Sequence, residues 1–195
     1  HLPLESSDLE IAEAISKLES AGITVTALGV VPLTRDARRC RRIFEFAEKI
    51  EVETICADPD PDSFETIERL IDEYGINVAI HNQGPGHRWG SFEAIRKALS
   101  SASDAVGICL DTGCFIRAGE DPLEPIRAMP DRVFGIHVKD SAKDESGEWR
   151  DVVLERGALR VRDLLAELKA KGFDGFLSLE YEGEPKDPVP AIREC

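Results

Sequence analysis

A histidine and a lysine interrupt an otherwise apolar stretch of the sequence, FGIHVKD at residues 134–140. Successive side chains of a β-strand point to opposite faces of the sheet. The stretch therefore predicts a strand with Ile136 and Val138 on one face and with Gly135, His137 and Lys139 on the other. An imidazole can bind a metal ion or move a proton, and an ammonium can bind an anionic group, so the second face could carry chemistry.

Three further stretches, at residues 76–81, 107–111 and 177–180, show the same alternation of aliphatic with small or polar residues. Each of them ends, at the carboxyl end of the expected strand, in a residue that can bind a metal ion or transfer a proton. These residues are His81, Asp111 and Glu180. Together with His137 they are expected to share one site.

Two imidazoles and two carboxylates are a natural ligand set for one divalent metal ion, with Mn, Zn, Co and Mg as the candidates. An open position on such an ion would polarise a hydroxyl or carbonyl of a substrate. Any one of the four residues alone is better explained as a polar residue satisfied at a strand end. Their recurrence on successive strands favours the metal site.

The elements that must position these residues alternate between strand and helix patterns at intervals of roughly 25 to 45 residues, which is typical of an α/β fold with a parallel sheet. One strand face is repeatedly small or polar, which suits a barrel interior better than an open sheet covered by helices on both faces. We therefore expect a (β/α)8 TIM barrel. The expected strands are residues 23–31, 52–57, 76–81, 107–111, 134–140 and 176–181, and the expected helices are residues 9–20, 36–50, 63–75, 91–99, 122–128 and 161–171.

A closed barrel of this type has eight strands, whereas the sequence shows about six and a possible strand remnant at residues 1–4. We therefore expect a single N-terminally truncated barrel domain over residues 1–195, lacking its first strand-helix unit. Such a chain would leave unpaired sheet edges at residues 23–31 and 176–181. Residues 58–61, 112–119 and 141–151 are expected to be loops.

The composition is that of a globular protein, with 42% hydrophobic and 32% charged residues in a chain of 195. A formal net charge of −14 would repel a phosphate backbone and argues against nucleic-acid binding. No apolar run is long enough to cross a membrane. The five cysteines are scattered without zinc-ribbon spacing, which favours a reducing compartment such as the cytoplasm. Assembly into a homo-oligomer remains open.

Four motifs, in this order, resemble the sugar phosphate isomerase/epimerase superfamily with its xylose-isomerase-like TIM barrel. They are LDTG at residues 110–113, GIHVKD at 135–140, GEWRDVV at 147–153 and LEYEG at 179–183. The resemblance implies that His81, Asp111, His137 and Glu180 hold the metal ion. His81 stands where better-known epimerases carry glutamate, and Gln83 and Cys114 stand where relatives often carry histidine.

The resemblance implies a metal-dependent isomerase or epimerase that moves a proton through an enediolate of a small polyhydroxylated carbonyl compound. Glu180 is the expected base, and His81 is the residue that could return the proton. Lys139 either binds a substrate oxygen or phosphate or pairs with Asp140 or Glu180 at the barrel rim. Loop residues on the same side are expected to contact the substrate, namely His87, Arg88, Cys114, Arg117 and Trp149.

Three alternatives remain. An inosose-type dehydratase or related lyase would use the same metal but expel hydroxide from the enediolate. A sugar-binding barrel without catalysis fits the substitutions at Gln83 and Cys114. The endonuclease branch of the superfamily is disfavoured, because it needs more histidine and acid ligands and a basic surface, whereas this chain has four histidines and a net charge of −14.

Overall fold

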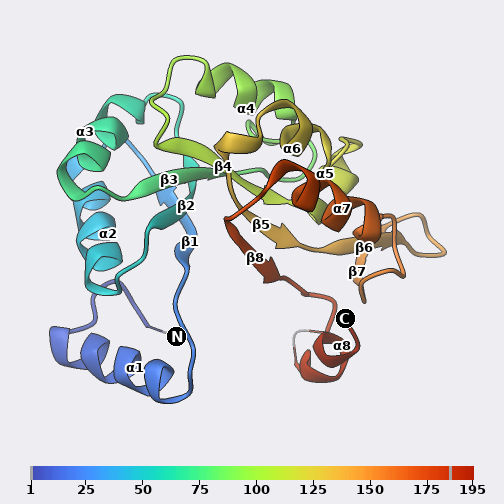
Figure 1. Ribbon diagram of the computed structural model, residues 1–195, viewed down its shortest axis with the longest axis horizontal. Helices are drawn as coiled ribbons and strands as arrows, with labels where there is room; N and C mark the ends of the chain where they lie inside the picture. Colours follow the sequence, from blue (N-terminus) through green and yellow to red (C-terminus); the bar gives the residue numbers. More distant parts are fainter. Residues whose placement is uncertain (1, 185) are drawn as a thin grey trace. The chain divides into compact units, whose positions relative to one another are not determined.

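The computed structural model describes residues 2–184 and 186–195 and contains a six-stranded sheet with the order β1-β2-β3-β4-β5-β8 (Figure 1). The pairs β1·β2, β4·β5 and β5·β8 are parallel. The strands are β1 (Ala27–Leu33), β2 (Thr54–Pro59), β3 (Asn77–His81), β4 (Val106–Asp111), β5 (Val133–Val138) and β8 (Phe176–Leu179). This is the expected barrel-type sheet, and β1 and β8 stand at the ends of its order, as predicted for the two edges.

Helices alternate with the strands. They are α1 (Asp8–Ser20), α2 (Ala37–Lys49), α3 (Phe64–Tyr74), α4 (Phe92–Leu99), α5 (Thr112–Ala118), α6 (Glu124–Ala128), α7 (Val161–Lys171) and α8 (Val189–Glu194). All of them except α5 and α8 lie where the apolar periodicity predicts a helix. Their ends follow local chemistry. Ser7 and Glu10 form a capping box at the start of α1, and Gly75 ends α3 in the left-handed conformation that glycine adopts without strain.

Several local predictions are wrong. Residues 112–119, expected as a loop, form α5, because the Asp111 carboxylate caps the helix and Gly119 ends it. The polar stretch at residues 141–151 contains the antiparallel hairpin of β6 (Asp140–Lys143) and β7 (Trp149–Val152), and β2 continues into the segment expected to be a loop. Residues 2–4 are not a strand, and the rest of that predicted remnant, His1, lies outside the described residues.

The chain divides into two compact units. The first comprises the chain up to Ala79 together with Ala102–Val106, and the second comprises Ile80–Ser101 and Gly107–Cys195. All four of the predicted metal ligands belong to the second unit.

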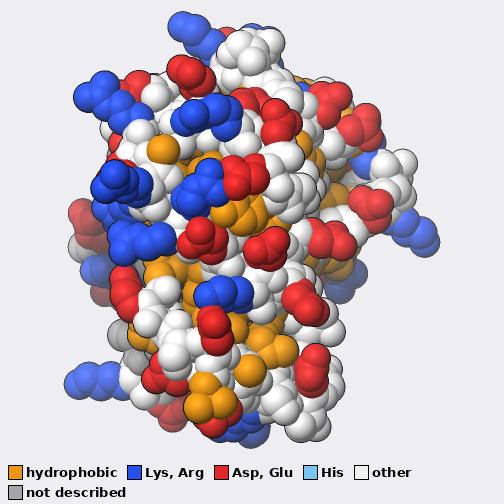
Figure 2. All heavy atoms as spheres, turned by 90° about the vertical axis from the view of Figure 1, so that its left-hand side faces the viewer, with side chains coloured by type: hydrophobic (Ala, Val, Ile, Leu, Met, Phe, Trp, Pro, Cys, Tyr) orange, Lys and Arg blue, Asp and Glu red, His pale blue; other side chains and the backbone are white. Residues whose placement is uncertain are grey.

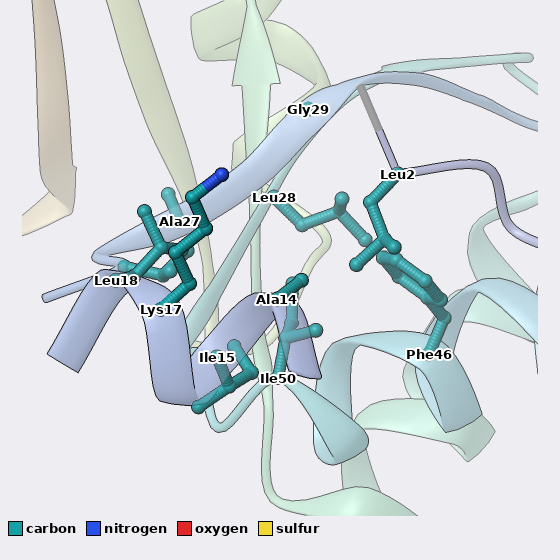
Figure 3. A pocket seen from close by; sticks show the side chains of 11 residues that line it. Leu2, Ala14, Ile15, Lys17, Leu18, Ala27, Leu28, Gly29, Phe46 and Ile50 are labelled. Carbon is teal, nitrogen blue, oxygen red and sulfur yellow. The ribbon is translucent and has the colours of Figure 1, made fainter. Parts of the chain in front are cut away.

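In the first unit, α1 presents the apolar face that its sequence predicts. Ile11 is buried, while Ala14, Ile15 and Leu18 line a groove with a volume of about 540 Å³ (Figure 3). Across the groove lie Leu28 of β1, Phe46 of α2 and Ile50, which directly follows α2. The face that carries α2 and α3 shows basic and acidic side chains intermingled (Figure 2). Arg41 of α2 and Glu73 of α3 form an ion pair.

The second unit is built around strands whose aliphatic side chains are fully buried, among them Ile108, Leu110 and Ile136. Strand β8 differs, since Leu177 and Leu179 are 48% and 41% exposed, although the sequence predicts that they pack under helices. Packing therefore restrains β8 less than its neighbours. Within residues 2–184 and 186–195, none of the helices combines the length and apolarity needed to cross a membrane.

Candidate metal and active site

The structure brings together the four residues that the sequence places at strand tips. His81 ends β3, Asp111 ends β4, His137 lies in β5 and Glu180 directly follows β8. Each offers one ligand atom, and these atoms all lie within 4.8 Å of one another. We refer to His81, Asp111, His137 and Glu180 as the ligand cluster.

The donor atoms face one another closely. His81 Nε2 lies 3.2 Å from His137 Nδ1, and His137 Nδ1 lies 2.8 Å from Glu180 Oε2. Asp111 Oδ2 lies 3.8 Å from His81 Nε2. His137 and Glu180 thus lie on the same side of the sheet, as the alternation of side chains along the strands predicts.

One oxygen of the cluster is left without a hydrogen bond. Asp111 is only 1% exposed, and its Oδ2 accepts no hydrogen bond from the described residues. Lys139 Nζ and His81 Nε2 each lie 3.8 Å from this oxygen, too far for a hydrogen bond. A buried acceptor without a hydrogen bond costs free energy, so such an oxygen usually binds an ion or a water. Together with the two imidazole nitrogens and the Glu180 oxygen, Asp111 Oδ2 completes a donor set that fits a divalent metal ion.

The other polar atoms of Asp111 are held by neighbouring residues. Its Oδ1 accepts a hydrogen bond from the backbone N–H of Cys114 at 2.7 Å and so caps α5. The buried Asn82 side chain accepts from the Asp111 N–H at 2.7 Å and donates to the Asp111 carbonyl at 2.8 Å. These contacts fix the carboxylate and leave Oδ2 as the atom available to an ion.

Gln83 is a site residue that the sequence analysis did not assign. Its side-chain amide lies 3.3 Å from Nδ1 of His81, the ring nitrogen that does not face the cluster. An imidazole that binds a metal ion through Nε2 carries its proton on Nδ1, so the Gln83 amide must turn its oxygen toward Nδ1 in place of the nitrogen that lies there now. The signal was the spacing, because residues two apart on an extended segment point to the same side.

Lys139 lies beside the cluster and is engaged by acids. Its side chain is 3% exposed, and its Nζ donates to Glu180 Oε1 at 2.6 Å and to Glu182 Oε2 at 2.7 Å. Burial alone would lower the pKa of Lys139, but the hydrogen bonds to the two glutamates outweigh it and raise that pKa. Of the two roles considered for Lys139, the structure shows the pairing with Glu180.

The two carboxyl groups of the cluster shift in opposite directions. The hydrogen bond with His137, reinforced by Lys139, outweighs burial and lowers the pKa of Glu180 to about 2. Burial raises the pKa of Asp111 above its ordinary value, against the opposing effects of the Cys114 N–H and of Lys139. Glu180 is therefore ionised at neutral pH and can act as a hydrogen-bond acceptor or a base.

The residues predicted to contact substrate lie outside the ligand cluster. Arg117 forms an ion pair with Asp151 of β7 at 2.5 Å, and Lys143 Nζ lies 5.3 Å from the centre of the Trp149 ring. Burial and the nearby Asp111 raise the pKa of the Cys114 thiol to about 12.

His87 and the exposed Arg88 lie in the loop after β3, where His87 Nδ1 accepts from the Trp89 N–H. As for the other residues predicted to contact substrate, their roles in binding it remain predictions.

Solved structures with this fold include a 31% identical uncharacterized protein from Parabacteroides distasonis ATCC 8503, with a TM-score of 0.74 over 99% of this chain and 76% of that one. An IolI protein with bound zinc is 20% identical, with a TM-score of 0.74 over 97% of this chain and 79% of that one. At this level of identity, the similarity supports a shared fold and nothing more.

A curated inosose dehydratase from Lacticaseibacillus casei is 25% identical over 141 residues, which are 64% of this chain and 47% of that protein. The chain thus spans about half the length of the curated relatives it matches. A model of the xylose isomerase-like TIM barrel family matches residues 3–194. This match covers almost the whole chain and agrees with the six-stranded sheet, so the chain belongs to the xylose isomerase-like TIM barrel family.

Proposed function

We propose that the protein catalyses metal-dependent proton transfer at the carbon beside the carbonyl of a small polyhydroxylated substrate, as a sugar or sugar phosphate isomerase or epimerase. The observation that carries the proposal is the ligand cluster, in which a buried Asp111 oxygen without a hydrogen bond faces two imidazoles and a second carboxylate. A divalent ion held there would polarise the carbonyl and stabilise the negative charge of an enediolate.

Glu180 is the proposed base. Its lowered pKa keeps it ionised at neutral pH, so it is in the protonation state that a base requires. The same low pKa makes it a weak base, so most of the driving force for removing the proton must come from stabilisation of the enediolate. His137 and Lys139 each hold one oxygen of this carboxylate and so restrict its orientation.

A second candidate is an inosose-type dehydratase, which removes the same proton but then expels hydroxide from the enediolate. It is favoured by the similarity to a curated inosose dehydratase. The presence of His81 where better-known epimerases carry glutamate also suits it, because an epimerase needs a second group that returns the proton to the opposite face of the carbon.

The test is elemental analysis of the purified protein, followed by incubation with ketoses and inososes in deuterated water. We expect one equivalent of a divalent metal and incorporation of deuterium beside the carbonyl, with no change in substrate composition for an isomerase or epimerase. Loss of one water would identify the dehydratase. A protein that binds metal and sugar but neither exchanges protons nor releases water would overturn both proposals in favour of a sugar-binding barrel without catalysis.

The role of His81 is tested by two substitutions. If His81 is a ligand, His81→Ala should lower metal affinity by about 10-fold or more. In contrast, His81→Glu should retain the metal, because a carboxylate replaces the imidazole at the same strand tip. Metal affinity is measured by competition with a chromogenic chelator, with His87→Ala as the control, since His87 lies outside the cluster. Full metal content with lost turnover in His81→Ala would instead assign His81 to proton transfer.

A further inference from the structure

Lys139 reaches the ligand cluster through a space that exists only because residue 113 is glycine. A Cβ atom at Gly113 would lie 2.6 Å from Cγ and 2.8 Å from Cδ of Lys139, well inside van der Waals contact. The residue lies in α5 and does not have a left-handed backbone conformation. Alanine is therefore compatible with the backbone, and the side chain of Lys139 is what excludes it.

The residue before this glycine fixes the backbone of the lysine. The hydroxyl of the fully buried Thr112 accepts a hydrogen bond from the Lys139 N–H at 2.9 Å and donates one to the Lys139 carbonyl at 2.7 Å. The start of α5 thus holds the lysine backbone by hydrogen bonds, and the absence of a Cβ at Gly113 leaves room for the lysine side chain. Nζ of that side chain donates to Oε1 of Glu180.

Glu180 has two side-chain contacts among the described residues, His137 on Oε2 and Lys139 on Oε1, so each of them matters for its orientation. It follows β8, whose Leu177 and Leu179 are largely exposed, and its own side chain is 29% exposed. A glutamate side chain loses appreciable conformational entropy when it is held in one rotamer. With Oε1 on Lys139, Oε2 is directed at His137 Nδ1, 2.8 Å away.

We propose that Lys139, seated in the space left by Gly113, is a positioning residue that holds Glu180 in the orientation required for metal binding and does not itself bind substrate. The catalytic role of Glu180 in this inference rests on the proposed function. The orientation of the Glu180 side chain can be measured whether or not that function is correct.

The first experiment is a double-mutant cycle on the affinity for Co²⁺. Gly113→Ala keeps every charge and displaces the lysine side chain, so it should weaken Co²⁺ binding by about 10-fold or more. In a Lys139→Ala background the overlapping Cγ and Cδ atoms are gone, and the same substitution should change affinity by less than about twofold. Lys139→Ala alone is not decisive, because loss of a positive charge beside a cation site strengthens cation binding by itself.

Two further measurements complete the cycle. Gly113→Ala should also have little effect in a Glu180→Ala background, where no carboxylate remains to be positioned. Lys143→Met, at an exposed lysine of β6, is the control and should leave Co²⁺ affinity within about twofold. An equal loss from Gly113→Ala in all three backgrounds, or no loss in the wild-type background, would overturn the proposal.

A crystal structure of the metal-free Lys139→Met variant tests the orientation directly and does not require Gly113→Ala to fold. We expect Glu180 to turn away from His137. A carboxylate that keeps the 2.8 Å contact with His137 Nδ1 without the lysine would show that no positioning is needed. A wild-type protein that binds no Co²⁺ would instead contradict the proposed function, and the crystal structure would still decide the role of Lys139.

Discussion

Asp111→Asn is expected to bind a divalent metal ion on the order of 100-fold or more weakly than the wild-type protein. Zinc binding at a site with four protein ligands contributes about 10 to 16 kcal/mol, so the loss of one anionic ligand should cost several kcal/mol. The amide oxygen of asparagine can still accept the Cys114 N–H and cap α5, since asparagine is a good N-cap residue. Its NH₂ group would then face the cluster, where it cannot bind a cation.

This prediction is checked by metal titration together with chemical unfolding of the metal-free protein. Asp174→Asn, at an exposed position before β8, is the matched control and should bind metal like the wild type. Retention of wild-type affinity by Asp111→Asn, in a protein of unchanged stability, would mean that the oxygen without a hydrogen bond is not a metal ligand.

Glu180→Gln is expected to lower kcat/KM for the proton-transfer reaction by about 10² to 10⁴-fold, the usual contribution of a general base. The glutamine amide oxygen can still accept from Lys139, but the NH₂ group then takes the place of the oxygen that faces His137, so both the basic oxygen and a metal ligand are lost. Steady-state kinetics and the rate of deuterium incorporation measure the effect, with Glu145→Gln in the exposed hairpin turn as the control. Deuterium incorporation at the wild-type rate would assign the base to another residue.

The ligand cluster could be predicted because two simple regularities determine it. Alternation along a strand fixes which face His137 occupies, and the parallel order of the strands brings their carboxyl ends to one edge of the sheet. Neither regularity depends on details of packing. The resemblance to a known superfamily pointed to the same four residues.

The loops could not be predicted in the same way, because their conformation depends on contacts between residues far apart in the sequence. Arg117 pairs with Asp151, 34 residues further on, and this pairing occupies a side chain expected to face substrate. Helix α5 was likewise expected to be a loop, and it contains Gly113 near its start. Gly113 is needed for the path of Lys139, a side chain 26 residues later in the chain.

The helix cap at the start of α5 also bears on how many coordination positions of a bound metal ion a substrate could occupy. Oδ1 of Asp111 is used by the helix cap and Oε1 of Glu180 by Lys139, so each carboxylate has one oxygen left for an ion. With one nitrogen from each histidine, the protein supplies four donor atoms. An ion that accepts about six ligands then keeps two positions, enough for a hydroxyl and a carbonyl oxygen on adjacent carbons to chelate it. In the proposed metal site, the helix cap would thus limit a substrate to two bonds with the ion.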